Sequence, residues 1–148
     1  MKYDITDFTG RQVTVSPRLA LYAVKDFMGT ELPGLAVILD DVTDPSEPEQ
    51  YAVLTVSFGE FIGIKNCAYI DTNNCDFADQ LQSQGLASDT GFYKASGFCK
   101  YPLWQFEEGT LREIDNDVYQ KYSDAYDGYM ASMYGDEPDE DGIQEISL

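Results

Sequence analysis

The stretch DVYQKYSDAYDGYM, residues 117–130, decides the architecture of the C-terminal third of this chain. Its four tyrosines recur at spacings of three and four residues, and of its three aspartates one precedes the tyrosines and two lie between them. On a helix that turns about 100° per residue, the tyrosines share one face and the carboxylates share another. The sequence therefore predicts an amphipathic helix from Asn116 to about Met133, with tyrosines against the core and carboxylates toward solvent.

The apolar face of this predicted helix, which we name the Tyr/Met stripe, consists of Tyr119, Tyr122, Tyr126, Tyr129 and Met133. Tyrosine is an unusual residue for a dry core, because each buried hydroxyl needs a hydrogen-bond partner or water. We therefore expect the stripe to cover one face of a sheet and to reach a rim, where part of it is available to an interface.

The opposite face of the predicted helix is acidic, and further acidic residues follow it along the chain. A rigid line of carboxylates competes with nucleic acid for the same lysine and arginine side chains, because duplex DNA carries about one negative charge per 1.7 Å of axis. The candidate partner-binding residues are Glu113, Asp117, Asp124, Asp127, Asp136, Glu137, Asp139, Glu140 and Asp141.

The charge of the whole chain limits the classes of partner. The 148 residues include 27 acids, 9 bases and no histidine, so the formal net charge is −18. Residues 1–100 carry 14 acids and 7 bases, whereas residues 101–148 carry 13 acids and 2 bases. Such a surface repels nucleic acid and anionic membranes and attracts basic surfaces. We therefore expect a basic protein surface as partner, with no direct nucleic-acid binding and no membrane binding.

Short segments rich in β-branched and aromatic residues alternate with turn sequences in the first half of the chain. These segments are RQVTV (11–15), RLALYAV (18–24), LAVIL (35–39) and YAVLTVSF (51–58). An acidic loop with two prolines, residues 40–50, separates the last two, since proline cannot continue a ladder. Because no helical pattern intervenes, the expected arrangement is an antiparallel sheet.

The middle of the chain adds a short helix to these strands. Residues 57–74 predict a further hairpin or strand pair around Gly59 and Gly63, and a helix over residues 76–84 follows. Asp76 or Asn74 is expected to cap this helix, and Gly85 is expected to end it.

Residues 90–106 return to an aromatic, glycine-punctuated pattern that predicts extended chain, with Trp104 and Phe106 on one strand face. The predicted fold class is therefore α+β: an antiparallel sheet, a short middle helix and a longer amphipathic C-terminal helix. We expect one domain over residues 1–134, followed by an acidic flexible tail over residues 135–148.

Two stretches are similar to calcium-binding loops but break the spacing rule of an EF-hand. In residues 135–145, placing Gly142 at the sixth loop position puts Leu148 at the twelfth, where a bidentate glutamate is required. Residues 71–79 lack a glycine at the sixth position. The three cysteines form no Cys-x-x-Cys pair, so with no histidine a zinc site is not expected. We expect neither a metal nor another cofactor.

Cys99, in SGFCKYP (96–102), is the one candidate nucleophile. No histidine exists to activate it, and its apolar surroundings favour a buried structural thiol. The segment GEFIGIK (59–65) lacks the spacing of a phosphate-binding loop. We therefore expect a non-enzymatic protein without catalytic residues. An enzyme whose catalytic residues are brought together only by folding is a further alternative.

The segment MKYDITDFTG, residues 1–10, lacks the apolar run of a signal peptide, and no segment approaches the length of a membrane span. Together with the cysteine usage, this favours a cytoplasmic protein with reduced thiols.

Two stretches, NCAYIDTNNCDFADQL (66–81) and TGFYKASGFCKYPLWQFEEGTL (90–111), carry a resemblance to a known family. They resemble small acidic bacterial proteins known only as a domain of unknown function. Members are carried on conjugative elements and related mobile DNA of Gram-positive gut bacteria. The resemblance spans roughly residues 51–114 and brings no catalytic or cofactor residues. It implies a setting, namely mobile DNA that must survive host defences.

This setting and the charge together predict an accessory protein of a mobile element. Its partner would be a basic, nucleic-acid-binding surface, such as that of a restriction or CRISPR effector, which it would inhibit as a DNA mimic. The alternative is a protein-interaction module or homodimer that uses the Tyr/Met stripe without nucleic-acid mimicry. The two differ in their response to salt, because exposed charge attractions are screened as ionic strength rises.

Overall fold

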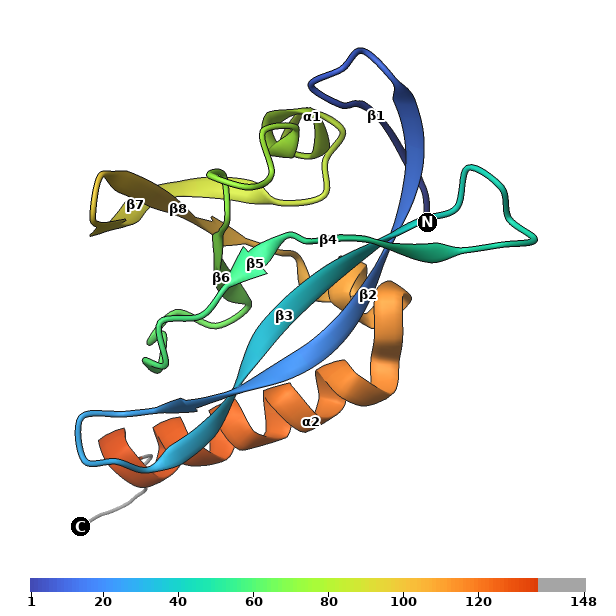
Figure 1. The fold of residues 1–148 in the computed structure, drawn as a ribbon. Coiled ribbons are helices and arrows are strands. Elements are labelled where there is room, and N and C mark those ends of the chain that lie inside the picture. Colours follow the sequence, from blue (N-terminus) through green and yellow to red (C-terminus); the bar gives the residue numbers. More distant parts are fainter. Residues whose placement is uncertain (136–148) are drawn as a thin grey trace, which may run out of the picture.

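Two four-stranded antiparallel sheets and two helices make up residues 1–135, the part of the chain that the computed structural model describes (Figure 1). The first sheet has the spatial order β1 (Tyr3–Thr6), β2 (Gln12–Lys25), β3 (Glu31–Asp41), β4 (Glu49–Val53). The second has the order β5 (Thr55–Val56), β6 (Cys67–Ile70), β8 (Cys99–Gln105), β7 (Ser88–Ser96). The helices are α1 (Ala78–Ser83) and α2 (Glu108–Tyr134). The predicted α+β class is confirmed.

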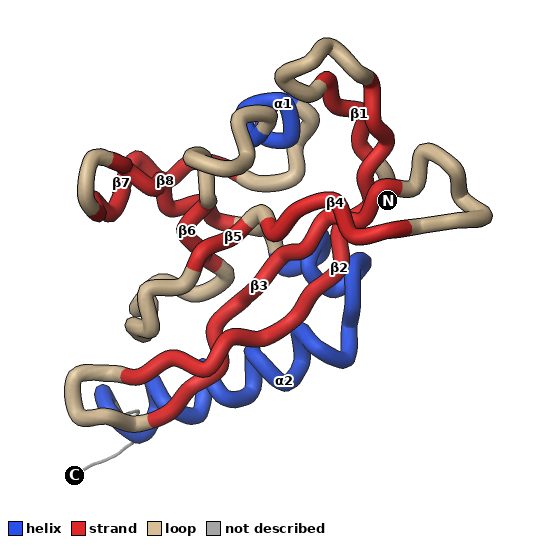
Figure 2. The backbone as a smooth tube through the Cα atoms, viewed as in Figure 1, coloured by secondary structure: helices blue, strands red, loops and turns tan. Residues whose placement is uncertain are grey.

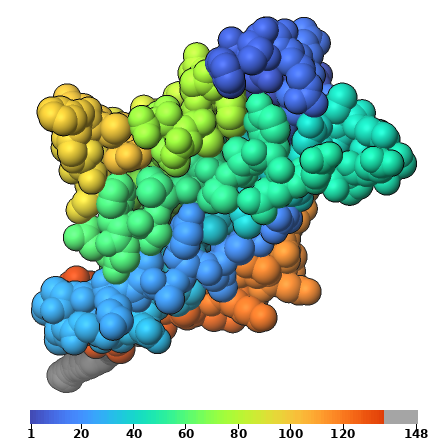
Figure 3. All heavy atoms as spheres, in the orientation of Figure 1, coloured from blue at the N-terminus to red at the C-terminus, as the bar shows by residue number. Residues whose placement is uncertain are grey.

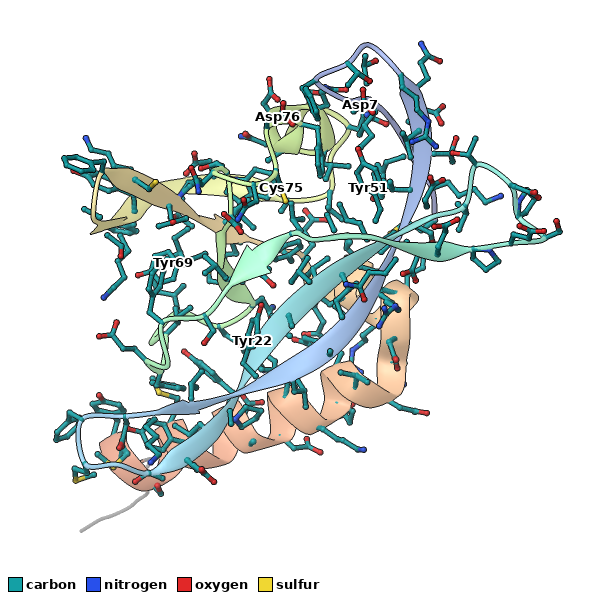
Figure 4. The ribbon with its side chains drawn as sticks, viewed as in Figure 1. Asp7, Tyr22, Tyr51, Tyr69, Cys75 and Asp76 are labelled. Carbon is teal, nitrogen blue, oxygen red and sulfur yellow. The ribbon has the colours of Figure 1, made fainter. Side chains whose placement is uncertain are left out.

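The long β2–β3 hairpin is the centre of the molecule. Figure 2 shows α2 along one face of this hairpin and the second sheet on the other. The middle of β3 is accordingly buried on both faces, at Leu35, Ala36 and Val37. Tyr22 of β2 links the two sheets, because its hydroxyl lies 3.2 Å from the carbonyl oxygen of Thr55 in β5 (Figure 4).

β2 is one strand where the sequence predicts two. Pro17, which separates the two predicted strands, is buried inside β2 opposite Leu39. The pairing of β1 with β2 ends at Val15, so Pro17 lies where β2 has β3 alone as a neighbour. A missing N–H is tolerated at such an edge position.

The predicted strand 51–58 is divided at Leu54 into β4 and β5, which belong to different sheets. The fully buried Leu54 joins the sheets through its backbone: its N–H donates to the Val37 carbonyl at 2.9 Å, and its carbonyl accepts from the Asp71 N–H at 2.8 Å. The predicted strand pair around Gly59 and Gly63 exists, because β5 and β6 pair antiparallel across the loop 57–66. Its first strand lies before residue 57, and β6 pairs with β8 on its other side.

α1 confirms the predicted short helix but not its predicted cap. Phe77 occupies the N-cap position without a side-chain hydrogen bond, and Asn74 bonds instead to the Asp71 carboxylate. Gly85 follows the helix with φ +89°, a left-handed conformation that glycine adopts at little cost.

α2 is longer than predicted and is broken once. Asp115 has extended backbone angles, φ −162° and ψ 99°, and its Oδ1 accepts a hydrogen bond from the Val118 N–H at 3.1 Å. Asp115 therefore caps the second helical segment, whose start agrees with the predicted start at Asn116. The first segment, Glu108 to Ile114, was not predicted as helix.

Candidate functional site

The inner face of α2 is built from tyrosines packed against β2 and β3. Tyr119 is fully buried, and Tyr122 and Tyr126 are 4% and 8% exposed. Asp117 and Asp124, on the other side of the helix, are exposed. The predicted separation of a tyrosine face from a carboxylate face is confirmed for this helix.

Asn66, in the loop before β6, supplies the polar partners that the buried hydroxyls need. The Tyr119 hydroxyl donates to its Oδ1 at 2.8 Å, and its own N–H donates to the Tyr122 hydroxyl at 2.9 Å. Its carbonyl accepts from the Phe106 N–H at 2.8 Å. Asn66 holds this position at φ 66°, a left-handed conformation that asparagine tolerates better than most residues.

The burial of Tyr122 raises the pKa of its phenol above the ordinary value, because the charged form would lose its hydration. The phenol is therefore neutral at physiological pH and stays able to accept the Asn66 N–H. Sequence reasoning missed Asn66, since a single asparagine in a loop gives no periodic signal.

The C-terminal end of α2 is anchored by an aromatic cluster. The Phe61 ring lies 5.5 Å from that of Tyr126 and 4.8 Å from that of Tyr129. The Tyr129 hydroxyl donates to Asp26 Oδ2 at 2.6 Å, which raises the pKa of Tyr129 to about 12 and lowers the pKa of Asp26. Asp26 also accepts the Met28 N–H and so holds the β2–β3 turn.

Most of the Tyr/Met stripe is thus occupied by contacts within the chain. Tyr119, Tyr122 and Tyr126 are covered, whereas Tyr129 and Met133 remain partly exposed toward the end of α2. An interface on this stripe could therefore use only its C-terminal end without unpacking the helix.

The acidic side chains on the outer face of α2 differ in whether they have a hydrogen-bond or ion-pair partner. Within residues 1–135, Asp117 makes no side-chain hydrogen bond or ion pair, whereas Asp124 accepts from Gln120 Nε2 at 2.8 Å. Asp127 pairs with Lys65 Nζ at 2.8 Å.

Glu113 is exposed but precedes the break at Asp115. The prediction of one unbroken line of carboxylates from Glu113 onward is therefore wrong at this point. Asp136, Glu137, Asp139, Glu140 and Asp141, with the rest of the predicted tail, lie outside the described residues.

Arg112 spans the break in α2. Its guanidinium donates to Glu108 at 2.8 Å on one side and to Asn116 and Gln120 at 2.8 and 2.9 Å on the other. It also lies 4.8 Å from the centre of the Tyr119 ring. The two basic residues of α2 therefore differ: the Arg112 side chain bonds to other residues of the helix, whereas Lys121 is exposed.

A family model with the description "Domain of unknown function (DUF4313)" matches residues 24–126. The chain belongs to this family. The DUF4313 match begins within β2 and ends within α2, so it includes the Asn66 loop, the second sheet, Asp117 and Asp124. Comparisons with curated proteins and with solved structures found no match.

The three cysteines of the DUF4313 chain lie outside α2 and are not disulfide-bonded. Burial raises the pKa of Cys67 and of Cys75 to about 11, so both thiols are protonated at neutral pH. Cys99, the candidate nucleophile, is half-buried at the start of β8. Residues 1–135 contain no cluster of three or more metal-ligating side chains. No helix in this range is long and apolar enough to span a membrane.

Proposed function

We propose that the outer face of α2 binds a basic, nucleic-acid-binding protein surface and that the protein acts without catalysis of its own. The observation that supports this is the exposure of Asp117 and Asp124 on a helix whose inner face is tied to Asn66. The two carboxylates are seven residues apart, which is about 10 Å along a helix axis. Glu113, before the break, and Asp127, beside Lys65, flank them.

A fixed helix is a better mimic of nucleic acid than a loop with the same charge. Binding costs less free energy when the interacting groups are already ordered, because side-chain and backbone freedom need not be lost on association. The hydroxyls of Tyr119 and Tyr122 and the aromatic contacts of Tyr126 hold the helix before any partner arrives.

The setting that the family resemblance implies gives this binding a purpose. On mobile DNA of Gram-positive bacteria, a cytoplasmic acidic protein that occupies the groove of a restriction or CRISPR nuclease protects the incoming element. The net charge of −18 supports such a role, since it favours encounter with a basic groove and disfavours binding to DNA itself.

The test is protection of plasmid DNA from a panel of restriction endonucleases and CRISPR effector nucleases. The outer-face variant combines Glu113→Gln, Asp117→Asn and Asp124→Asn, all at exposed positions. The matched control combines Glu47→Gln, Glu49→Gln and Asp79→Asn, which are exposed and lie outside α2. Both variants lose three negative charges, so they differ only in where the charge is removed.

We expect the parent and the control variant to block at least one nuclease at low salt, and the outer-face variant to be weaker. Exposed charge pairs contribute about 0.2–1 kcal/mol each, so three of them change the inhibition constant by about 3- to 100-fold. The difference should shrink as salt rises. Equal inhibition by both variants, or no inhibition by the parent, would contradict the proposal.

A further inference from the structure

One end of the molecule carries a group of exposed apolar side chains, which we name the aromatic end. It is formed by the β2–β3 turn, the loop 57–66, the β7–β8 hairpin and the C-terminus of α2, all on the left in Figure 1. Its exposed residues are Phe27, Met28, Ile64, Phe92, Tyr93, Phe98 and Tyr134.

The aromatic end combines projecting rings with hollows. Phe27 is 83% exposed in the β2–β3 turn, and Phe98 is fully exposed at the tip of the β7–β8 hairpin. Figure 3 shows these two hairpin ends projecting from the body of the molecule, with the loop between them. A hollow of about 340 Å³ lies between this loop and β7, and a second of about 550 Å³ lies between the loop, the β2–β3 turn and α2.

The loop that separates the two hollows is held by backbone hydrogen bonds to β2. The Lys25 N–H donates to the Gly59 carbonyl, and the Phe61 N–H donates to the Lys25 carbonyl, both at 2.9 Å. Both hollows include Glu60, Phe61 and Gly63 in their walls. The hollows are therefore parts of one surface with a fixed shape.

Among residues 1–135, the walls of these two hollows carry nearly balanced charge. The charged residues in the walls of the two hollows are Lys25, Asp26 and Glu60, and Glu60 pairs with Lys94 at 2.7 Å. A hollow beside the β3–β4 loop, by contrast, is lined by one base, Arg11, and four acids: Asp41, Asp44, Glu47 and Glu49.

We propose that the aromatic end is the interface of a homodimer. A two-fold interface places the same patch on both subunits, so the patch must complement itself. The aromatic end meets this requirement, because it presents projecting phenylalanines together with hollows of about 340 and 550 Å³. Two copies with a net charge of −18 repel each other, and the balanced charges in the walls of the two hollows add little to that repulsion.

The dimer is independent of the proposed binding of a basic partner, since it uses another face. Sedimentation velocity of the full chain over a range of concentrations measures it directly. The interface variant combines Phe27→Ser and Phe98→Ser. The matched control is Phe8→Ser, because Phe8 is 85% exposed in the β1–β2 turn, outside the aromatic end.

We expect the parent and Phe8→Ser to form dimers and the interface variant to dissociate at least tenfold more readily, with equal melting temperatures at dilutions at which all three proteins are monomeric. Added salt should strengthen the dimer by screening the repulsion between subunits, which is opposite to its effect on binding through the outer face of α2. A parent that stays monomeric at high concentration and high salt would overturn the proposal. So would a dimer that the interface variant leaves intact, whatever the nuclease panel shows.

Discussion

The two faces of α2 differ in how their side chains are partnered. On the inner face, the hydroxyls of Tyr119, Tyr122 and Tyr129 each have a defined partner in a neighbouring loop or turn. On the outer face, Asp117 has no such partner among residues 1–135. Tyrosine suits the inner face because its ring fills the core while its hydroxyl reaches a polar group at the rim. The comparison teaches that the inner side chains hold the helix, whereas Asp117 on the outer face contributes no side-chain hydrogen bond or ion pair within residues 1–135.

Substitution of Asn66 should break the inner face most severely. Asn66→Ala leaves the buried Tyr119 hydroxyl without its acceptor, which costs about 1–3 kcal/mol. It also places alanine at φ 66°, which costs about 1–2 kcal/mol. We expect the free energy of unfolding, measured with urea, to fall by about 2–4 kcal/mol.

Two further variants separate these causes. Asn66→Gly should recover the conformational part of the loss and retain the hydrogen-bond part. Asn73→Ala, at an exposed asparagine nearby in the chain, should change the unfolding free energy by less than about 0.5 kcal/mol. An Asn66→Ala protein as stable as the parent would show that the hydrogen bond from Tyr119 to the Asn66 side chain does not hold α2.

How far these features could be predicted depends on whether they are local. The helix over residues 116–133 was predictable, because the spacing of its tyrosines is a local pattern and Asp115 caps it from the adjacent position. The division at Leu54 was not, since the residues of β4 and β5 have the same strand-like composition and only their distant partners differ.

The contacts that matter most to the candidate site arise from residues far apart in the sequence. Asn66 meets Tyr119 across 53 positions, and Lys65 meets Asp127 across 62. The helical spacing of the aspartates predicted their exposed face, but it gave no indication that Asp127 is paired or that Glu113 precedes a break. Those facts require the packed structure.

Alkaline pH should weaken the core beneath the inner face. Burial raises the pKa of the Cys67 and Cys75 thiols from 9.0 to about 11, and Tyr122 is raised in the same direction. Because the folded pKa exceeds the unfolded one, this stabilisation is fully present below pH 9 and is lost as the pH rises toward 11. We expect the unfolding free energy to fall by on the order of 2 kcal/mol for each thiol over that range.

Urea unfolding at a series of pH values checks this expectation. A Cys67→Ala variant should show a shallower decline, since one of the ionising groups is gone, even if the variant is less stable at neutral pH. An unfolding free energy that does not change between pH 9 and pH 11 would show that these thiols are accessible to water in the folded protein.

Substitutions on the outer face should have the smallest effect on the free energy of unfolding. Comparing them with a substitution on the inner face is the most direct test that the two faces differ in what they contribute to stability. The measurement compares the urea unfolding free energy of the Glu113→Gln, Asp117→Asn, Asp124→Asn variant with that of Tyr122→Phe, which removes the acceptor of the Asn66 N–H. We predict that the outer-face variant lies within about 0.5 kcal/mol of the parent, whereas Tyr122→Phe loses about 1–3 kcal/mol. An outer-face variant that loses more than about 2 kcal/mol would contradict the account, because the carboxylates would then stabilise the fold. A Tyr122→Phe protein that loses nothing would also contradict it, because the hydrogen bond between Tyr122 and Asn66 would then not hold the helix.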